Sequence, residues 1–348
     1  MVFAVIVLLS FPLQQISSVA LMGSFLIKPV NIMNVVGAVL KIIILIVFSS
    51  FHLGSLGILL ALSSQFFIIG TVLLIIAFKK FGFEFKISTL KTAFLEGISN
   101  YPTKLTGVFQ YFGSISILTL FAVPFEDIAG FTLSYGFLVL ITAIPAGFSL
   151  LSISSLTKEK ESSAVSMTWG MAIAIPIITI MFTSSDWILS IYKDIYSKYA
   201  GLLVILAISI IPLILKTNVI TMLNNQGALK KIVLLGIIES VIFLSAIVFL
   251  VPSIGAIGGA WAVAISSISA AILSLYWVNN TIRRIFFTSI LIVAVGVASG
   301  LLVQQIIDNR LIVTLVGFGT STASMFLFRL IRFSEILFII NQIKSRNF

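Results

Sequence analysis

Apolar residues in this chain come in blocks of about twenty, separated by short polar stretches. A block of that length crosses about 30 Å of hydrocarbon as an α-helix, whereas a transmembrane β-barrel needs alternating segments of about ten residues. Only 9% of the residues are charged, against roughly a quarter in a soluble domain. The sequence therefore predicts an all-α polytopic membrane protein.

The apolar blocks predict eleven transmembrane helices, two of which form a pair after the last bundle. The helices are expected at about 2–22, 31–50, 55–78, 104–123, 128–151, 164–183, 199–217, 230–251, 254–277, 286–305 and 311–331. The longest polar interval separates the third and fourth helices. The predicted domains are a partial N-terminal bundle of three spans (1–78), a cytoplasmic linker (79–103), a six-helix bundle (104–278) and an extra helix pair with a cytoplasmic tail (279–348).

The basic residues predict the orientation, because cytoplasmic loops of membrane proteins carry an excess of Lys and Arg. One set of alternate loops, with the C-terminal tail, holds most of the 21 basic residues. The opposite loops hold only Lys193, Lys198 and Arg310, with several acids. The first set comprises Lys28, Lys79, Lys80, Lys86, Lys91, Lys104, Lys158, Lys160, Lys216, Lys230, Lys231, Arg283, Arg284, Arg329, Arg332, Lys344 and Arg346. The chain is therefore expected to be a multi-pass protein of the cell membrane with a cytoplasmic C-terminus.

Residue usage argues against several other classes of protein. The chain has no cysteine and a single histidine, His52, so we expect no disulfide, no metal centre and no cofactor. The net charge of +10 is accounted for by the cytoplasmic loops, and we expect no nucleic-acid partner. There is no His–acid cluster, no phosphate-binding P-loop and no large loop, so an enzyme is a poor interpretation.

An odd number of spans with a cytoplasmic C-terminus would place Met1 outside the cell. Met1 nevertheless begins directly on an apolar run, with no preceding residues that would favour export of the N-terminus. We therefore expect the chain to be an N-terminally shortened version of a longer protein. A native outside N-terminus is the alternative.

Two helical hairpins form an internal repeat at an offset of 201 residues. Gly54 and Gly57 in the first hairpin align with Gly255 and Gly258 in the second. Glycines at this spacing allow close backbone approach where two antiparallel helices meet at a tight turn. Both hairpins enter from the predicted cytoplasmic side, so the repeats are parallel. The second lobe would have six spans and the first only three, which again suggests three missing helices.

On these residues the chain resembles the multidrug, oligosaccharidyl-lipid and polysaccharide exporter superfamily, and within it the polysaccharide-biosynthesis (O-antigen-type) flippases. The resemblance rests on the hairpin Ser253–Ser267, on its counterpart after Gly54, on Phe125–Tyr135, and on Asn224-Asn225-Gln226-Gly227 before a basic pair. The spans would match helices four to fourteen of a fourteen-helix member.

The resemblance implies two helical lobes around a central cavity and transfer of a polyprenyl-pyrophosphate-linked sugar to the outer leaflet by alternating access. It implies membrane lipids as further partners, and glycan-assembly enzymes as candidate ones. The extra helix pair would form a groove for the polyprenyl tail. Many relatives carry an acid in the seventh helix, where this chain has Gly113-Ser114, so the coupling ion stays open.

Two charged residues lie deep inside predicted helices, where burial costs about 2.5–3.5 kcal/mol on insertion scales. Lys41 and Glu239 are each about fifteen ångströms from a helix end at 1.5 Å per residue, and they lie on equivalent helices of the repeat. Facing the cavity, Lys41 would attract a pyrophosphate, and Glu239 would bind sugar hydroxyls or titrate. The alternative is a structural ion pair between them, or polar contacts with neighbouring helices.

The helix that begins near Lys104 carries a polar stripe of Gln110, Tyr111 and Ser114, with Gly107 on the same face. Such a stripe faces either water in a cavity or another helix, and both readings stay open. Lys104 and the stripe are candidate cavity residues. Tyr135 is a weaker one, because aromatic residues near helix ends usually belong to the interfacial belt.

Two other functions compete with the flippase. A cation-coupled drug antiporter of the same superfamily would need an intramembrane acid, for which Glu239 is the candidate, whereas Lys41 would repel cationic drugs. A truncated, non-transporting membrane scaffold is the third reading. Transport assays with and without three upstream helices would separate the scaffold from the transporters.

Overall fold

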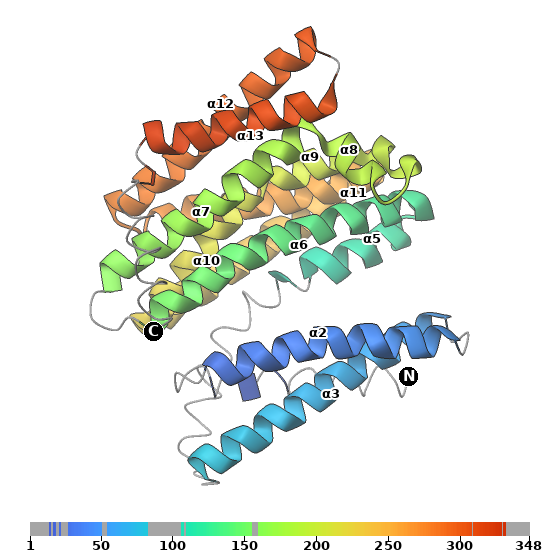
Figure 1. Ribbon diagram of the computed structural model, residues 1–348, viewed down its shortest axis with the longest axis vertical. Helices are drawn as coiled ribbons and strands as arrows, with labels where there is room; N and C mark the ends of the chain where they lie inside the picture. The colour runs from blue at the N-terminus through green and yellow to red at the C-terminus, as the bar shows by residue number, and fades with distance from the viewer. Residues whose placement is uncertain are drawn as a thin grey trace, which may run out of the picture. The chain divides into compact units, whose positions relative to one another are not determined.

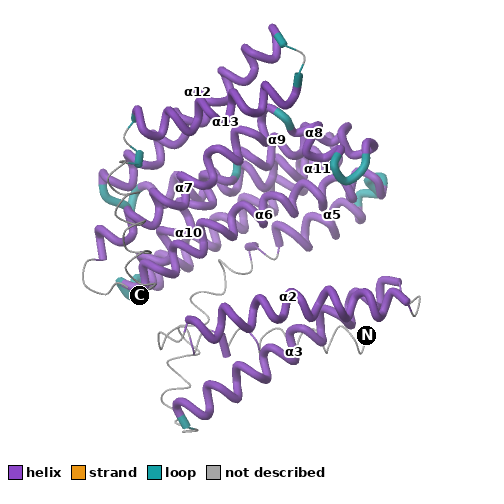
Figure 2. The backbone as a smooth tube through the Cα atoms, viewed as in Figure 1, coloured by secondary structure: helices purple, strands orange, loops and turns teal. Residues whose placement is uncertain are grey.

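The computed structural model describes residues 27–50, 54–82, 106–107, 109–154, 159–307, 309–328 and 330–331, together with Gln14, Ser17, Ser18 and Leu21. Nearly all of these residues are helical, and the fold is the predicted all-α polytopic one (Figures 1 and 2). The predicted helix at 2–22 lies outside the described residues except for the four named ones. Most of the predicted linker lies outside them too.

The chain divides into two compact units, residues 1–91 and 92–348. The first unit contains the antiparallel helices α2 (Ile27–Ser50) and α3 (Gly54–Phe81). These helices pack closely at Gly37, where a Cβ atom would come within 2.9 Å of the Ile69 side chain. Small residues at such crossings let helices approach in lipid, where packing rather than water exclusion drives association.

The second unit is a bundle whose core includes the fully buried side chains Phe131, Met171 and Phe243. Its helices in chain order are η1 (Phe109–Gly113), α5 (Ser114–Leu120), α6 (Phe125–Ser154), α7 (Glu159–Thr183), α8 (Ser185–Ser190), η2 (Asp194–Tyr199), α9 (Ala200–Ile208), α10 (Ile210–Asn225), α11 (Leu229–Leu275), α12 (Asn280–Ile306) and α13 (Arg310–Leu327).

The long element α11 is two helices joined by a sharp turn. Ile254 and Gly255 have non-helical backbone angles, and Gly255 has a φ of +57°, which strains any residue with a Cβ. At Gly258 an added Cβ would come within 2.5 Å of the Leu250 backbone. The close backbone approach that the glycine spacing predicts is therefore confirmed for this second hairpin.

The final helix pair packs onto α7 through small residues (Figure 1). An added Cβ at Gly296 of α12 would meet Ser321 of α13 at 2.8 Å and Thr179 of α7 at 3.0 Å. At Gly300, one turn later, it would meet Thr183 at 2.6 Å. Glycine at both positions lets the three helices touch along their length.

Six helical segments of the described residues are long and apolar enough to cross a membrane, α11 with its two halves among them. Many large apolar side chains on their surfaces are exposed, for example Phe249 at 76% and Leu302 at 61%. Water would make such a surface unstable, whereas lipid tails solvate it. These surfaces fit the membrane class predicted from the sequence.

Candidate functional site

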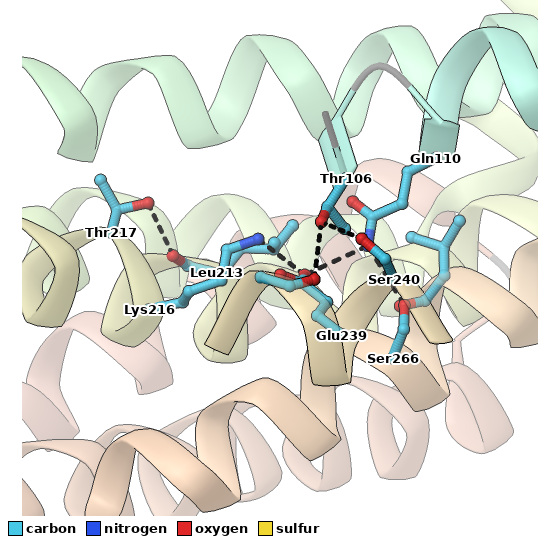
Figure 3. Close-up of polar contacts among 10 residues, drawn as sticks. Thr106, Gln110, Leu213, Lys216, Thr217, Glu239, Ser240 and Ser266 are labelled. Carbon is cyan, nitrogen blue, oxygen red and sulfur yellow. Dashed lines mark hydrogen bonds and ion pairs between the residues drawn. The ribbon is translucent and has the colours of Figure 1, made fainter. Parts of the chain in front are cut away.

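Glu239 lies on the first half of α11 and is fully buried inside the second unit. Its Oε1 atom accepts a hydrogen bond from the Lys216 ammonium of α10 at 2.7 Å, and Lys216 is only 8% exposed (Figure 3). Removing a charge from water costs several kcal/mol, so buried charges persist where an opposite charge and hydrogen bonds compensate them. Glu239 and Lys216 form such a compensated pair.

The pairing follows from the hairpin that joins α10 to α11. Lys216 precedes the end of α10 at Asn225 by nine residues, and Glu239 follows the start of α11 at Leu229 by ten. At 1.5 Å per residue both lie about 14–15 Å from the same turn. The turn is set by Gly227, whose φ of +64° ends α10. Two oppositely charged residues are thus held at one depth near the middle of the bundle.

Gln110 joins the pair to the other half of α11. Its Nε2 donates to Glu239 Oε1 at 3.2 Å and to Ser266 Oγ at 3.1 Å. Glu239 and Ser266 are 27 residues apart, which would be about 40 Å along a straight helix. One amide group reaches both residues only because α11 folds back on itself. Gln110 therefore connects three segments of the unit.

Gln110 is carried by η1, a single π-helical turn at the start of the short helix α5. Its backbone carbonyl accepts a hydrogen bond from the Ser114 hydroxyl at 2.7 Å. Before this turn, Thr106 lies within hydrogen-bonding distance of Ser240 at 2.6 Å and donates to the Gly236 carbonyl at 3.2 Å. Isolated π-turns are rare overall and are frequently found at functional sites.

One acceptor atom of the cluster receives no hydrogen bond from the described residues. Glu239 Oε1 receives both the Lys216 and the Gln110 bonds, whereas Glu239 Oε2 is buried with no hydrogen-bond partner among the described residues. A buried carboxylate oxygen without a donor is unfavourable by about 1–3 kcal/mol or more. The arrangement therefore has unused acceptor capacity at a fully buried position.

Two tyrosines that the sequence singled out lie beside each other near this cluster. The rings of Tyr111 and Tyr135 are 5.2 Å apart, and Tyr135 also approaches Phe131 at 5.9 Å. Tyr135 is buried in α6 at 5% exposure, while Tyr111 is half-buried. Tyr135 is thus part of the unit's interior and not of an interfacial belt.

The structure brings some of the predicted cavity residues together and leaves others undescribed. Gln110 and Glu239 are in direct contact, and the Ser114 hydroxyl donates to the Gln110 backbone carbonyl. All three are buried and engaged in contacts inside the second unit. Lys41 belongs to α2, but its side chain lies outside the described part of the chain, as does Lys104 entirely. The role of these residues in a cavity stays a prediction.

The sequence-based assignment of Lys216 to a cytoplasmic loop is wrong. The helix was expected to end at 217, but α10 continues to Asn225. It can continue because its polar residues are bonded internally: Thr217 Oγ1 donates to the Leu213 carbonyl at 2.9 Å, and Asn218 Nδ2 donates to the Ile214 carbonyl at 2.9 Å. Without Lys216, one set of loops still holds sixteen basic residues and the opposite set holds three. The prediction of orientation therefore keeps its basis.

Thr106, Ser240 and Ser266 also belong to the cluster and were not predicted from the sequence. Hydroxyl residues are common in membrane helices and carry little information alone. The position of Lys216 inside a helix could have been predicted from two features of the sequence. Apolar residues resume after it, and its distance from the turn at Gly227 matches that of Glu239.

Ion pairs join the loops at one end of the second unit. Lys198 pairs with Glu126 at 2.9 Å, and Arg310 pairs with Asp186 at 2.8 Å. The Tyr199 hydroxyl donates to Asp127 at 2.8 Å. The sequence assigned all these loops to the side opposite the Lys-rich loops. Their contacts place them at one end of the unit.

The part of the chain that the structure describes contains no group of three or more His, Asp or Glu side chains that could hold a metal ion. The buried cluster is a polar and ion-paired site. Its chemistry is hydrogen bonding and charge compensation within a membrane helix bundle.

Neither the protein-family models nor the curated proteins include a match to this sequence. Among solved structures, the chain is similar to the lipid II flippase MurJ in an inward closed conformation, with a TM-score of 0.66 and 14% sequence identity. The match covers 92% of this chain and 72% of that one. At this identity the likeness shows the fold alone, and the narrower O-antigen-type resemblance stays a prediction.

Proposed function

We propose that this chain is a transporter that moves a polyprenyl-pyrophosphate-linked oligosaccharide from the cytoplasmic to the outer leaflet by alternating access. Two features support the proposal together. The fold is similar to that of a lipid II flippase. The second unit also keeps charged and amide groups buried in the middle of helices that are otherwise apolar.

The observation that carries the proposal is the Lys216–Glu239–Gln110 cluster. Ionisable residues inside a membrane bundle are rare because they are costly, and they commonly mark substrate or ion pathways. The cluster joins η1, α10 and both halves of α11. A rearrangement of any of these helices would expose its donors and acceptors, which suit the hydroxyl groups of a sugar.

The anionic part of the substrate needs a separate basic residue, because the Lys216 charge is compensated by Glu239. Lys41, deep in α2, is our candidate for contact with the pyrophosphate, and Lys104 is a second candidate. In this proposal Tyr111 and Tyr135 contribute stacking and hydrogen-bonding surface for the sugar. The extra helix pair, α12 and α13, would lie beside the polyprenyl tail.

The rival reading as a cation-coupled drug antiporter has weaker support. Such a transporter needs an intramembrane acid that exchanges protons or sodium ions, and Glu239 is the candidate. Its ammonium partner at 2.7 Å already balances the negative charge, which opposes binding of a second cation. One observation still favours the antiporter. Glu239 Oε2 has no hydrogen-bond partner among the described residues and is available as an acceptor.

We further propose that the chain works in the cell membrane with its C-terminus in the cytoplasm, next to the enzymes that assemble the glycan. The Lys-rich loops, with Lys216 removed from the count, support this orientation.

A reconstitution experiment tests the proposed function. The full chain in proteoliposomes would be given a polyprenyl-pyrophosphate-linked oligosaccharide on one side, and a sugar-binding lectin would report its arrival on the other. We expect translocation above that of empty vesicles, and a loss of about tenfold or more in Lys41→Gln if an ion-paired hydrogen bond to the pyrophosphate is removed. Lys230→Gln, at an exposed position, is the charge-matched control.

Two results would contradict the proposal. One is an absence of lectin-accessible sugar under sodium, proton and membrane-potential gradients alike. The other is gradient-dependent uptake of a cationic drug by vesicles that leave the lipid-linked sugar in place, which would support the antiporter.

A further inference from the structure

An apolar crevice in the second unit shares no lining residue with the buried polar cluster. It has a volume of about 420 Å³, and its lining comes from α7, from α9 and α10, from the second half of α11, and from α12. Every lining side chain is apolar, including Ile178, Ile211, Ile272 and Val293. A concave site of this size is within the range of small-molecule pockets. A crevice with this apolar lining can accommodate a hydrocarbon chain.

The break between α9 and α10 contributes to the inner wall of the crevice. The two helices are interrupted at Ser209, and Pro212 follows three residues later. Proline has no N–H to bond the Ile208 carbonyl, which weakens the helix at this point. Ile208 and Pro212 both line the crevice.

A second cavity, which adjoins the crevice, is lined by a basic residue. This cavity of about 300 Å³ shares Ile272, Leu275 and Phe287 with the crevice and is also lined by Arg283 and Tyr276. The Arg283 Nε atom donates to the Leu275 carbonyl at 2.9 Å, which fixes the guanidinium at the mouth. Its terminal amino groups carry four further N–H donors and have no partner among the described residues.

Other groups at this end suit the headgroup region of a bilayer. Lys231 of α11 lies 6.0 Å from the ring of Trp277. Tryptophan, tyrosine and basic residues are typical of the membrane–water interface, and basic clusters there attract anionic lipids. The end of the crevice therefore complements a negatively charged headgroup.

The length of the crevice matches that of a lipid acyl chain, which spans one leaflet. Arg283 and Val293 are ten residues apart on α12, a rise of about 15 Å. This is half of the ~30 Å hydrocarbon thickness. Val293 is also the central residue of α12. A guanidinium at the surface and an apolar crevice that ends near the midplane match the dimensions of a phospholipid in the leaflet that Arg283 faces.

We propose that this crevice binds an anionic phospholipid, with its phosphate on Arg283 and one acyl chain between α10, α11 and α12. The lipid would fill the space beside the α9–α10 break and join α12 to the bundle. This site shares no residue with the Lys216–Glu239–Gln110 cluster, so loss of lipid binding here and loss of sugar transport there can be measured separately.

Lipid titration of the purified full chain tests the site. The protein in neutral detergent would be titrated with dipalmitoyl phosphatidylglycerol or with phosphatidylcholine of the same chains, and native mass spectrometry would count the bound lipids. We expect one tight phosphatidylglycerol, bound about tenfold more strongly than phosphatidylcholine. Arg283→Gln should weaken it about tenfold, equivalent to about 1.4 kcal/mol.

Arg284→Gln is the matched control, because it removes the same charge from the next residue, which does not line either cavity. It should leave the affinity within about twofold. Ile290→Trp places bulk in the crevice at a position already 43% exposed, so folding should survive while both lipids bind more weakly.

Several outcomes would overturn the proposal. Equal affinity for the two phospholipids, or equal losses in the Arg283 and Arg284 variants, would remove the headgroup site. Glycerol 3-phosphate bound as tightly as the lipid would make it a free-phosphate site. A polyprenyl phosphate that displaces phosphatidylglycerol at equal concentration would assign the crevice to the transported lipid. Unchanged binding in a folded Ile290→Trp variant would refute the acyl-chain position.

Discussion

Replacing Lys216 by methionine should destabilise the second unit strongly. The ammonium and the Glu239 carboxylate are 2.7 Å apart, which corresponds to an attraction of about 6 kcal/mol at an effective dielectric constant of 20. Much of this attraction offsets the desolvation of the two charges. Removal of one partner leaves the other charge buried alone, at a typical loss of 3–5 kcal/mol. We therefore expect Lys216→Met to lower the free energy of unfolding by about 3–5 kcal/mol.

A double-mutant cycle separates the ion pair from simple packing. Unfolding of the detergent-solubilised chain by denaturant, followed by tryptophan fluorescence, would be measured for Lys216→Met, Glu239→Leu and the double variant. Because the double variant buries no unpaired charge, its loss should be smaller than either single loss, with a coupling energy of about 3 kcal/mol or more. Lys230→Met, which removes an exposed charge, should unfold like the wild type.

Additive losses in the cycle would refute the reasoning, since they would mean that the two charges do not sense each other. A Lys216→Met variant as stable as the Lys230→Met control would do the same. Either result would mean that the 2.7 Å pair of Lys216 and Glu239 does not contribute to the stability of the folded chain.

Two further predictions concern the turn of α11 and the surface ion pairs. Gly258→Ala should lower the free energy of unfolding by about 1–3 kcal/mol, because its Cβ would come within 2.5 Å of the Leu250 backbone. Gly136→Ala, which has open space around it, should not destabilise the chain. Equal effects of the two substitutions would contradict the tight turn. Arg310→Gln should change stability by less than about 1 kcal/mol, because its pair with Asp186 is well exposed to solvent; a larger loss in the same unfolding assay would contradict this estimate.

The class of fold could be predicted from the sequence because lipid leaves few choices for the backbone. A span must satisfy its own hydrogen bonds, so a twenty-residue apolar block is a helix almost by necessity. The predicted hairpin at 230–251 and 254–277 corresponds to α11, and Gly255 and Gly258 mark its turn. Most helix boundaries follow from the same rule.

The polar cluster could be predicted only in part. Glu239 and Gln110 were identified because a charge or an amide in an apolar helix is conspicuous. Their contact depends on the folding back of α11, which brings Glu239 and Ser266 to one amide group. Lys216 was misassigned because basic residues near a helix end usually belong to a loop. The extension of α10 involves local bonds from the Thr217 and Asn218 side chains to carbonyls one turn earlier, which the sequence pattern does not reveal.

The most direct test of the central claim is translocation of a lipid-linked oligosaccharide by proteoliposomes that contain either the wild-type chain or the folded Lys216→Met/Glu239→Leu variant. We predict lectin-accessible sugar for the wild type and a loss of about tenfold or more for the variant, equivalent to at least ~1.4 kcal/mol. Transport by the variant at the wild-type rate would show that the buried pair only supports the fold. Wild-type vesicles that behave like empty ones would contradict the transport function itself.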